Sequence, residues 1–287
     1  MGVVRRFPLG RRRPRTAFVM GGGGNLGAVQ VGMLRAVLER EILPDLVVGC
    51  SVGALNGAAV AAQPTLTTID RLADLWRGLT GEDIWPAGRL TGPWQLLRRG
   101  DSLHSNRGLR RIIEGALAVR QFEELAVPFE CVATSLTTGM AHWFSSGRLV
   151  DPILASAALP AVFPPVTING DRYIDGGVVD NVPISRALAL GAHRVVVFHV
   201  GNIARRRPEP RRPLDVLVHA FSIGRGHRFH VDLASLPDGV EAIVLPSVEP
   251  PGRLRYDDLA RSADLIDLGH RAAAAHLDAG AAETART

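Results

Sequence analysis

The sequence predicts an α/β protein, a three-layer α/β/α sandwich with a mostly parallel central sheet. Short apolar runs at 16–20 and 46–50 have the length of buried strands, and helical patterns follow them at about 26–41 and 52–62. This strand–helix–strand–helix order is typical of a parallel sheet covered by helices. With 287 residues, 46% of them hydrophobic, the chain can bury a large core.

The chain is expected to have a basic N-terminal arm, residues 1–15, and one domain over residues 16–280. Asn25 and Ser105 are side chains of the kind that cap helices. The later predicted strands cover residues 127–135, 140–144, 172–175, 194–200 and 240–245. Besides the first two helices, helical patterns cover residues 66–78, 106–118, 151–158, 214–235 and 255–278. Residues 80–104 are rich in Gly, Pro and Trp and are predicted to form a loop or cap.

The composition excludes several classes of protein. Two cysteines, Cys50 and Cys131, are too few for a disulfide framework or a four-thiolate zinc site. No run of 18 apolar residues is present, so a spanning helix is not expected. The basic N-terminus is not followed by the apolar segment of a signal peptide. We therefore expect a cytoplasmic protein, with peripheral membrane contact as a further option.

The basic residues are unevenly distributed. The formal net charge is +5, and arginines gather at 5–15 and 205–212. Such runs are usually solvated, but they also attract anionic surfaces such as lipid headgroups. Nucleic acid is not expected as a partner, because aromatic residues make up only 5% of the chain and no binding motif is present. The sequence gives no indication of the oligomeric state.

The first chemical motif is a G-x-S-x-G pattern, Gly49 to Gly53, between an apolar strand and a helix rich in small residues. A nucleophile elbow requires this context, with Ser51 exposed at a tight turn and its hydroxyl beside a helix N-terminus. A plain glycine–serine turn is the alternative. The strand–turn–helix setting favours a nucleophilic Ser51.

The second motif is the glycine-rich loop from Gly21 to Gly27, also between a strand and a helix. Its G-x-G-x-x-G pattern is compatible with dinucleotide binding, which requires an acid at the end of the second strand. That strand ends at Cys50 and Ser51 instead. The loop is therefore interpreted as an oxyanion hole, in which backbone amides point at one substrate oxygen.

The third motif is Asp175-Gly176-Gly177, which follows an apolar strand. A carboxylate in this position can face a cleft, although a simple turn aspartate is the alternative. Asp180 and Asn181 follow and are interpreted as residues that fix the turn, with Asn181 bonding backbone before Pro183.

Together, the stretches 21–32, 49–57 and 175–177, with the Ala155–Pro165 segment, resemble the patatin-like phospholipase family. The resemblance covers about residues 16–200 and implies a lipid acyl hydrolase with a serine–aspartate dyad. It implies Ser51 as nucleophile and Asp175 as general base. The resemblance assigns the oxyanion-hole amides to Gly22, Gly23 and Gly24, with Gly27, Gly49, Gly53, Gly176 and Gly177 as motif glycines. One position departs from the family pattern, because Leu26 stands where a basic residue is usual.

The expected activity is that of a phospholipase A or lysophospholipase-like esterase that acts on a lipid or lysolipid and needs no metal or cofactor. Two alternatives stay open. One is a Ser-Asp-His α/β-hydrolase, and the other is a catalytically weak, lipid-binding regulatory protein. The histidines late enough in the chain to complete a triad are His219, His227, His230, His270 and His276, whereas His199 lies in an apolar strand and is interpreted as a core residue bonded to backbone.

Overall fold

The computed structural model describes residues 15–84, 102, 104–201, 213–248 and 258–284. Of the predicted features, residues 1–14 of the arm, residues 85–101 of the loop and the arginine run at 205–212 lie outside the described residues. Cys50 and Cys131 are both buried and free.

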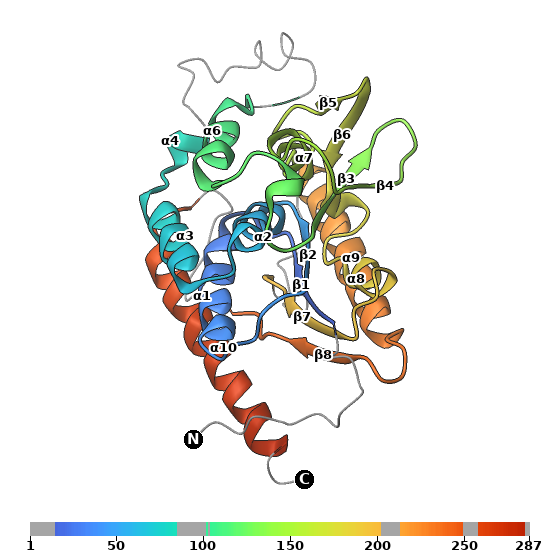
Figure 1. The fold of residues 1–287 in the computed structure, drawn as a ribbon. Helices are drawn as coiled ribbons and strands as arrows, with labels where there is room; N and C mark the ends of the chain where they lie inside the picture. The colour runs from blue at the N-terminus through green and yellow to red at the C-terminus, as the bar shows by residue number, and fades with distance from the viewer. Residues whose placement is uncertain (1–14, 85–101, 103, 202–212, 249–257, 285–287) are drawn as a thin grey trace.

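The centre of the fold is an eight-stranded sheet with the order β5-β6-β3-β2-β1-β7-β8, and β4 pairs with β3 beside this path (Figure 1). Neighbouring strands are parallel along the stretch β3-β2-β1-β7-β8 of this order. The pairings of β3 with β4, β3 with β6, and β5 with β6 are antiparallel. The prediction of a mostly parallel sheet is therefore confirmed. The strands are β1 Thr16–Met20, β2 Leu46–Cys50, β3 Phe129–Ser135, β4 Ala141–Phe144, β5 Val166–Ile168, β6 Asp171–Asp175, β7 Arg194–Phe198 and β8 Glu241–Val244.

Helices cover both faces of the sheet, as the alternating side chains of β1 require. Phe18 and Met20 join a core with α1, α2, α3, α6, α7 and α10, whereas Ala17 and Val19 join a second core with α8 and α9. This arrangement confirms the three-layer α/β/α sandwich. The helices are α1 Gly27–Leu38, α2 Val52–Ala62, α3 Leu66–Gly78, α4 Gly81–Ile84, α6 Arg107–Ala116, α7 Val150–Ser156, α8 Ile184–Ala189, α9 Pro213–Ala234 and α10 Ser262–Thr284.

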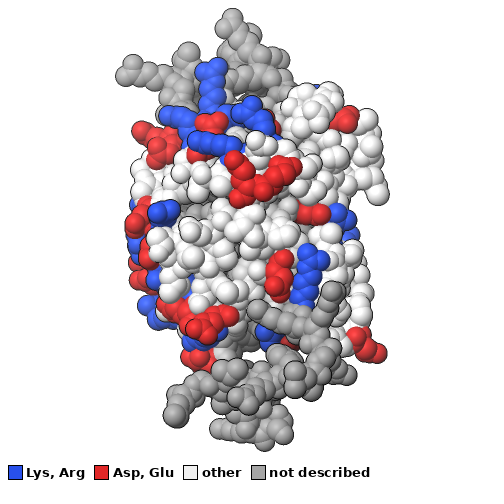
Figure 2. All heavy atoms as spheres, viewed as in Figure 1, with Lys and Arg blue, Asp and Glu red and all other residues white. Residues whose placement is uncertain are grey.

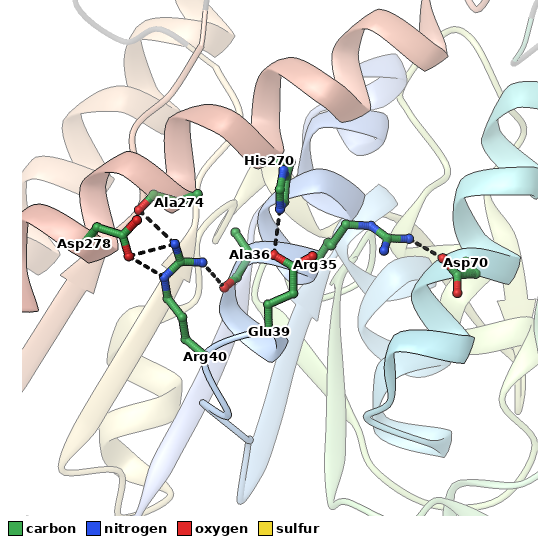
Figure 3. A network of polar contacts seen from close by, with 8 residues as sticks. All are labelled: Arg35, Ala36, Glu39, Arg40, Asp70, His270, Ala274 and Asp278. Carbon is green, nitrogen blue, oxygen red and sulfur yellow. Dashed lines mark hydrogen bonds and ion pairs between the residues drawn. The ribbon is translucent and has the colours of Figure 1, made fainter. Parts of the chain in front are cut away.

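The C-terminal helix α10 lies directly against α1. A Cβ added at Gly32 of α1 would lie 2.0 Å from the carbonyl oxygen of Ile266, and one at Gly269 would lie 2.3 Å from that of Val29. The two glycines therefore allow the two backbones to approach closely. Polar contacts flank this seam: His270 bonds Glu39 at 2.7 Å, and Arg40 bonds Asp278 at 2.8 Å (Figure 3).

Several local predictions are wrong. Asn25 does not cap α1: the N-cap residue is Leu26, and the Asn25 side chain donates to the carbonyl of Asp258 at 2.9 Å. Ser105 does not cap α6, whose N-cap residue is Asn106. The sequence did not predict β5 and α8, because a three-residue strand and a six-residue helix are too short to give a periodic pattern. No helix in the described segments combines the length and apolar character needed to cross a bilayer.

Candidate active site

Ser51 lies at the sharp turn between β2 and α2 with a backbone φ of 55° and ψ of −125°. Such a positive φ is strained for a residue with a side chain, and it is the conformation expected of a nucleophile elbow. The turn is possible because its two glycines leave room for other backbone segments. A Cβ at Gly49 would lie 2.6 Å from the carbonyl oxygen of Gly53, and one at Gly53 would lie 2.2 Å from that of Met20.

The sheet register brings Asp175 to Ser51. On one edge of β3, Val132 pairs with Cys50 at the end of β2, and the next residue, Ala133, pairs with Asp175 at the end of β6. The ends of β2 and β6 therefore meet along β3. Because Ser51 follows Cys50 directly, the serine and the aspartate lie side by side although 124 residues separate them.

The two side chains bond to each other directly, since Ser51 Oγ donates to Asp175 Oδ2 at 2.7 Å. The other carboxylate oxygen accepts from the amide of Gly177 at 2.7 Å, and the amide of Ser51 donates to Ser156 Oγ at 2.8 Å. Asp175 is 2% exposed. This burial raises its pKa, while the Arg225 charge and the bonds from Ser51 and Gly177 act in the opposite direction.

The glycines after Asp175 are also required by close contacts. A Cβ at Gly176 would lie 2.3 Å from the carbonyl oxygen of Val132, and one at Gly177 would lie 2.9 Å from Asp175 Oδ1. Larger residues at these positions would therefore displace β3 or the carboxylate.

In the glycine-rich loop, the structure differs from the prediction at Gly22. Its amide donates to the carbonyl of Asn181 at 3.0 Å, so it is engaged within the protein. Within the described residues, no hydrogen bond from the amides of Gly23 or Gly24 is found, and both glycines line the same cavity as Ser51. Gly27 begins α1 and has no room for a side chain, because a Cβ would lie 2.3 Å from Val52 Cγ2.

Sequence reasoning missed a buried polar network below the loop. Gln30 Nε2 donates to the carbonyls of Gly21 at 2.6 Å and Phe198 at 3.0 Å. Asn56 Nδ2 donates to Gln30 Oε1 and to the carbonyl of Gly27, both at 3.0 Å, and Asn56 Oδ1 accepts from Trp76 Nε1 at 3.1 Å. The sequence signal for this network is the presence of the polar residues Gln30 and Asn56 within otherwise apolar helical stretches. The network holds the base of the loop to α1, α2 and α3.

Ser51, Asp175, Gly23 and Gly24 line a cavity of about 870 Å³. This volume is within the range of about 300–1,000 Å³ found for small-molecule sites. Much of its wall is apolar and comes from the helices around α2. These side chains include Leu55, Trp76, Leu79, Leu109, Ile112, Ile113, Ile153 and Phe163.

The histidines are not arranged as a catalytic triad. His199, His219, His227 and His230 line the cavity, whereas His270 bonds Glu39 at the α1–α10 seam and His276 is exposed on α10. His199 stacks on Phe229 with 4.6 Å between ring centres, and burial lowers its pKa to about 4. Ser51 Oγ bonds Asp175 without an intervening imidazole. No cluster of three metal-ligating side chains is found in the part of the chain that the structure describes.

A three-layer α/β/α fold with a serine at an elbow and a buried carboxylate bonded to it is the architecture of a serine hydrolase. The family model for patatin-like phospholipases matches residues 18–188. The chain belongs to the patatin-like phospholipase family, whose members hydrolyse ester bonds, and the predicted family resemblance is confirmed.

Two curated relatives illustrate this membership. Lysophospholipase NTE1 of Mycosarcoma maydis is 32% identical over 198 residues, which cover 66% of this chain and 10% of that protein. Patatin-like phospholipase domain-containing protein 7 of Rattus norvegicus is 31% identical over 188 residues, which cover 65% of this chain and 14% of that protein. The chain therefore matches only a small part of these much longer proteins.

Among solved structures, VipD from Legionella pneumophila has a similar fold, with a TM-score of 0.51 at 14% sequence identity. The alignment covers 93% of this chain and 67% of that one, so the similarity extends beyond the segment that the family model matches. In the described structure, β7, which lies after residue 188, pairs with β1 in the middle of the sheet.

Proposed function

We propose that this chain hydrolyses acyl ester bonds of lipids, with lysophospholipids as the expected substrate class, through an acyl-Ser51 intermediate. The observation that carries the proposal is the 2.7 Å hydrogen bond from Ser51 Oγ to Asp175 Oδ2 at the wall of a largely apolar cavity. The substrate class is supported by the similarity to lysophospholipases described above.

In the first half of the proposed reaction, Asp175 accepts the hydroxyl proton as Ser51 Oγ attacks the ester carbonyl carbon. The carbonyl oxygen becomes an oxyanion, which the amides of Gly23 and Gly24 stabilise. When the tetrahedral intermediate collapses, the bond to the alcohol breaks and protonated Asp175 returns the proton to the leaving oxygen. The acyl group stays on Ser51.

In the second half, Asp175 takes a proton from a water molecule that attacks the acyl-serine carbonyl. The second tetrahedral intermediate uses the same amides, and its collapse releases the fatty acid and returns the proton to Ser51. A carboxylate at its usual pKa is a weak base at neutral pH. The burial that raises the pKa of Asp175 makes this carboxylate a stronger proton acceptor.

The cavity supports a lipid substrate. An acyl chain against Leu55, Leu109 and Ile153 would bury apolar surface on both sides, at about 0.8 kcal/mol for each CH₂ removed from water. Trp76 also lines the cavity, and its ring nitrogen is occupied by a hydrogen bond to Asn56 Oδ1. We expect preference for long-chain acyl esters over acetyl esters.

The test is hydrolysis of a panel of lysophospholipids, phospholipids, triglycerides and p-nitrophenyl esters by wild-type protein, Ser51→Ala and Ser146→Ala. Ser146 is an exposed serine outside the cavity and serves as the matched control. The proposal predicts turnover by wild type and Ser146→Ala, and its loss in Ser51→Ala. Folded wild-type protein that binds lipid without turnover would instead indicate the weakly catalytic regulatory protein.

We also propose reversible contact with anionic membranes. Helix α6 presents Leu109, Ile112 and Ile113 to the cavity and carries exposed Arg107 and Arg111. Figure 2 shows basic side chains gathered at the end of the molecule where α6 lies. The arginine runs at 5–15 and 205–212 add further positive charge. Each arginine near an anionic surface is worth about 1 kcal/mol, screened over about 8–10 Å at physiological salt.

Sedimentation with vesicles of phosphatidylserine and phosphatidylcholine tests this contact. We expect binding at low salt that weakens as salt rises, and weaker binding by Arg107→Gln/Arg111→Gln. Absence of binding at low salt would refute the membrane proposal, and equal binding by a chain lacking residues 1–14 would remove the arm from it.

A further inference from the structure

Both polar backbone groups of Gly22 are held by one residue, Asn181. The Gly22 amide donates to the Asn181 carbonyl at 3.0 Å, and the Gly22 carbonyl accepts from Asn181 Nδ2 at 3.3 Å. Asn181 is 9% exposed and lies six residues after Asp175, on the segment that leaves the Asp-Gly-Gly turn. Its side chain thus acts across the site on the glycine-rich loop.

This contact controls the neighbouring amide. The carbonyl of Gly22 and the N–H of Gly23 belong to one planar trans peptide group, in which they point in opposite directions. Holding the Gly22 carbonyl therefore fixes the direction of the Gly23 N–H. Consecutive glycines restrict backbone rotation least, so a loop of this kind needs an external contact to keep one orientation.

Arg225 of α9 determines which way the Asn181 amide faces. The guanidinium group donates to Asn181 Oδ1, and a guanidinium can only donate. A flipped Asn181 would place its NH₂ group against those donors and its oxygen against the Gly22 carbonyl. Arg225 thus keeps Asn181 Nδ2 on the loop.

Arg225 also lies close to the dyad. A Cβ built at Gly22 would lie 3.0 Å from Arg225 Nη2, and one at Gly177 would lie 3.1 Å from it. The guanidinium therefore lies between the glycine-rich loop and the Asp-Gly-Gly turn. Its charge lowers the pKa of Asp175 against the larger effect of burial. The loop itself has Leu26, and no cation, at the position noted above.

We propose that Arg225 is a positioning residue: through Asn181 it fixes the Gly22–Gly23 peptide that presents an oxyanion-hole amide, and it supplies from α9 the positive charge that the loop lacks. This inference rests on the proposed ester hydrolysis. Since α9 follows the matched family segment, the site is incomplete without the C-terminal part of the chain.

The variants that test this are Arg225→Met, Arg225→Lys, Asn181→Ala and the double variant Arg225→Met/Asn181→Ala. Removal of one oxyanion-hole donor costs about 10²–10³ in kcat, so a misaligned donor should cost about 10- to 100-fold. We expect losses of that size in kcat, with smaller changes in KM, for Arg225→Met and for Asn181→Ala. The double variant should be no slower than the slower single variant, because the two residues act as one unit.

The pH profile separates the charge from the hydrogen bond. Without the Arg225 charge, the pKa of Asp175 rises further, so the acidic limb of kcat/KM moves to higher pH in Arg225→Met. Arg225→Lys keeps the charge and should restore the limb, and Asn181→Ala should leave it in place. Arg194→Met is the control, because Arg194 bonds Glu241 at the opposite end of β7.

Amide hydrogen exchange of a peptide covering residues 20–27 reads the loop without any turnover. We expect faster exchange in Arg225→Met and Asn181→Ala than in wild type and Arg194→Met. Wild-type protein without esterase activity would overturn the proposed function, and loop exchange would then still test the contact. Turnover and exchange equal to wild type in both single variants would overturn the positioning role.

Discussion

Replacing Asp175 with asparagine is expected to change activity and stability in opposite directions. The asparagine oxygen can accept from the Gly177 amide, and its NH₂ group can donate to Ser51 Oγ. Both partners of the carboxylate therefore keep a hydrogen bond, although the bond with Ser51 runs in the opposite direction. The serine then has no proton acceptor. General-base catalysis contributes about 10²–10⁴ in rate, and we expect a loss at the upper end because the dyad has no third member.

The gain in stability follows from burial. At neutral pH the fold must hold a carboxylate that is 2% exposed, and burial is the largest influence on its pKa. A neutral amide removes that cost and loses the weaker attraction of Arg225. We expect a gain of about 0.5–2 kcal/mol, the usual size of the effect of a single stabilising substitution. For domains of 150–250 residues, each kcal/mol raises Tm by about 2–4 °C.

The raised pKa of Asp175 determines how this gain in stability changes with pH. Because the folded-state pKa of Asp175 is raised, the folded protein keeps this proton at pH values where the unfolded chain has released it. The group's contribution to stability is therefore fully present below the ordinary carboxyl pKa and is lost as pH rises through the raised value. The advantage of Asp175→Asn should be small near pH 4 and larger at pH 8.

The assay combines thermal unfolding at pH 4 and pH 8 with turnover of a p-nitrophenyl ester. Asp171→Asn, an exposed aspartate on the same strand, is the matched control and should change neither quantity. A Tm below wild type at pH 8, or activity within tenfold of wild type, would refute the reasoning.

Three further predictions concern the core, a second buried acid and the histidines. Gly32→Val should lower the free energy of unfolding in urea by about 1–3 kcal/mol, because its Cβ would meet the α10 backbone, whereas Gly280→Ala at an open position of α10 should not. Burial raises the pKa of Asp180 to about 6, so the wild type should lose up to about 3 kcal/mol of stability between pH 4 and pH 6, and Asp180→Asn should lose less over the same titration. Variants with a single histidine replaced by alanine should each retain more than a tenth of the wild-type activity; the positions are His199, His219, His227, His230, His270 and His276. A loss as large as that of Ser51→Ala in any one of these variants would establish a triad.

The parts of the site that the sequence predicts are those with local motifs. Ser51 could be located because a tight turn needs Gly49 and Gly53 within a few residues, between a strand and a helix. Asp175 could be located by its two following glycines. Their direct contact depends on the pairing of β3 with both β2 and β6, which no local pattern contains.

The residues that were missed or misjudged act over long sequence distances. Asn181 is 159 residues from Gly22, and Gln30 is 168 residues from Phe198, so their roles emerge only when the strands are adjacent. The engaged amide of Gly22 has the same origin, because its acceptor comes from another segment. Arg225 lies on a helix whose sequence shows no motif.

The central claim, acyl transfer through Ser51 with Asp175 as base, is tested most directly by trapping the intermediate. Wild-type protein would be mixed with a long-chain p-nitrophenyl ester, quenched in acid within the first turnovers and digested for peptide mass spectrometry. The account predicts the acyl mass on the peptide that contains Ser51, and its absence from Ser51→Ala and Asp175→Asn. An acyl group on another residue, or ester turnover that continues in Ser51→Ala, would contradict it.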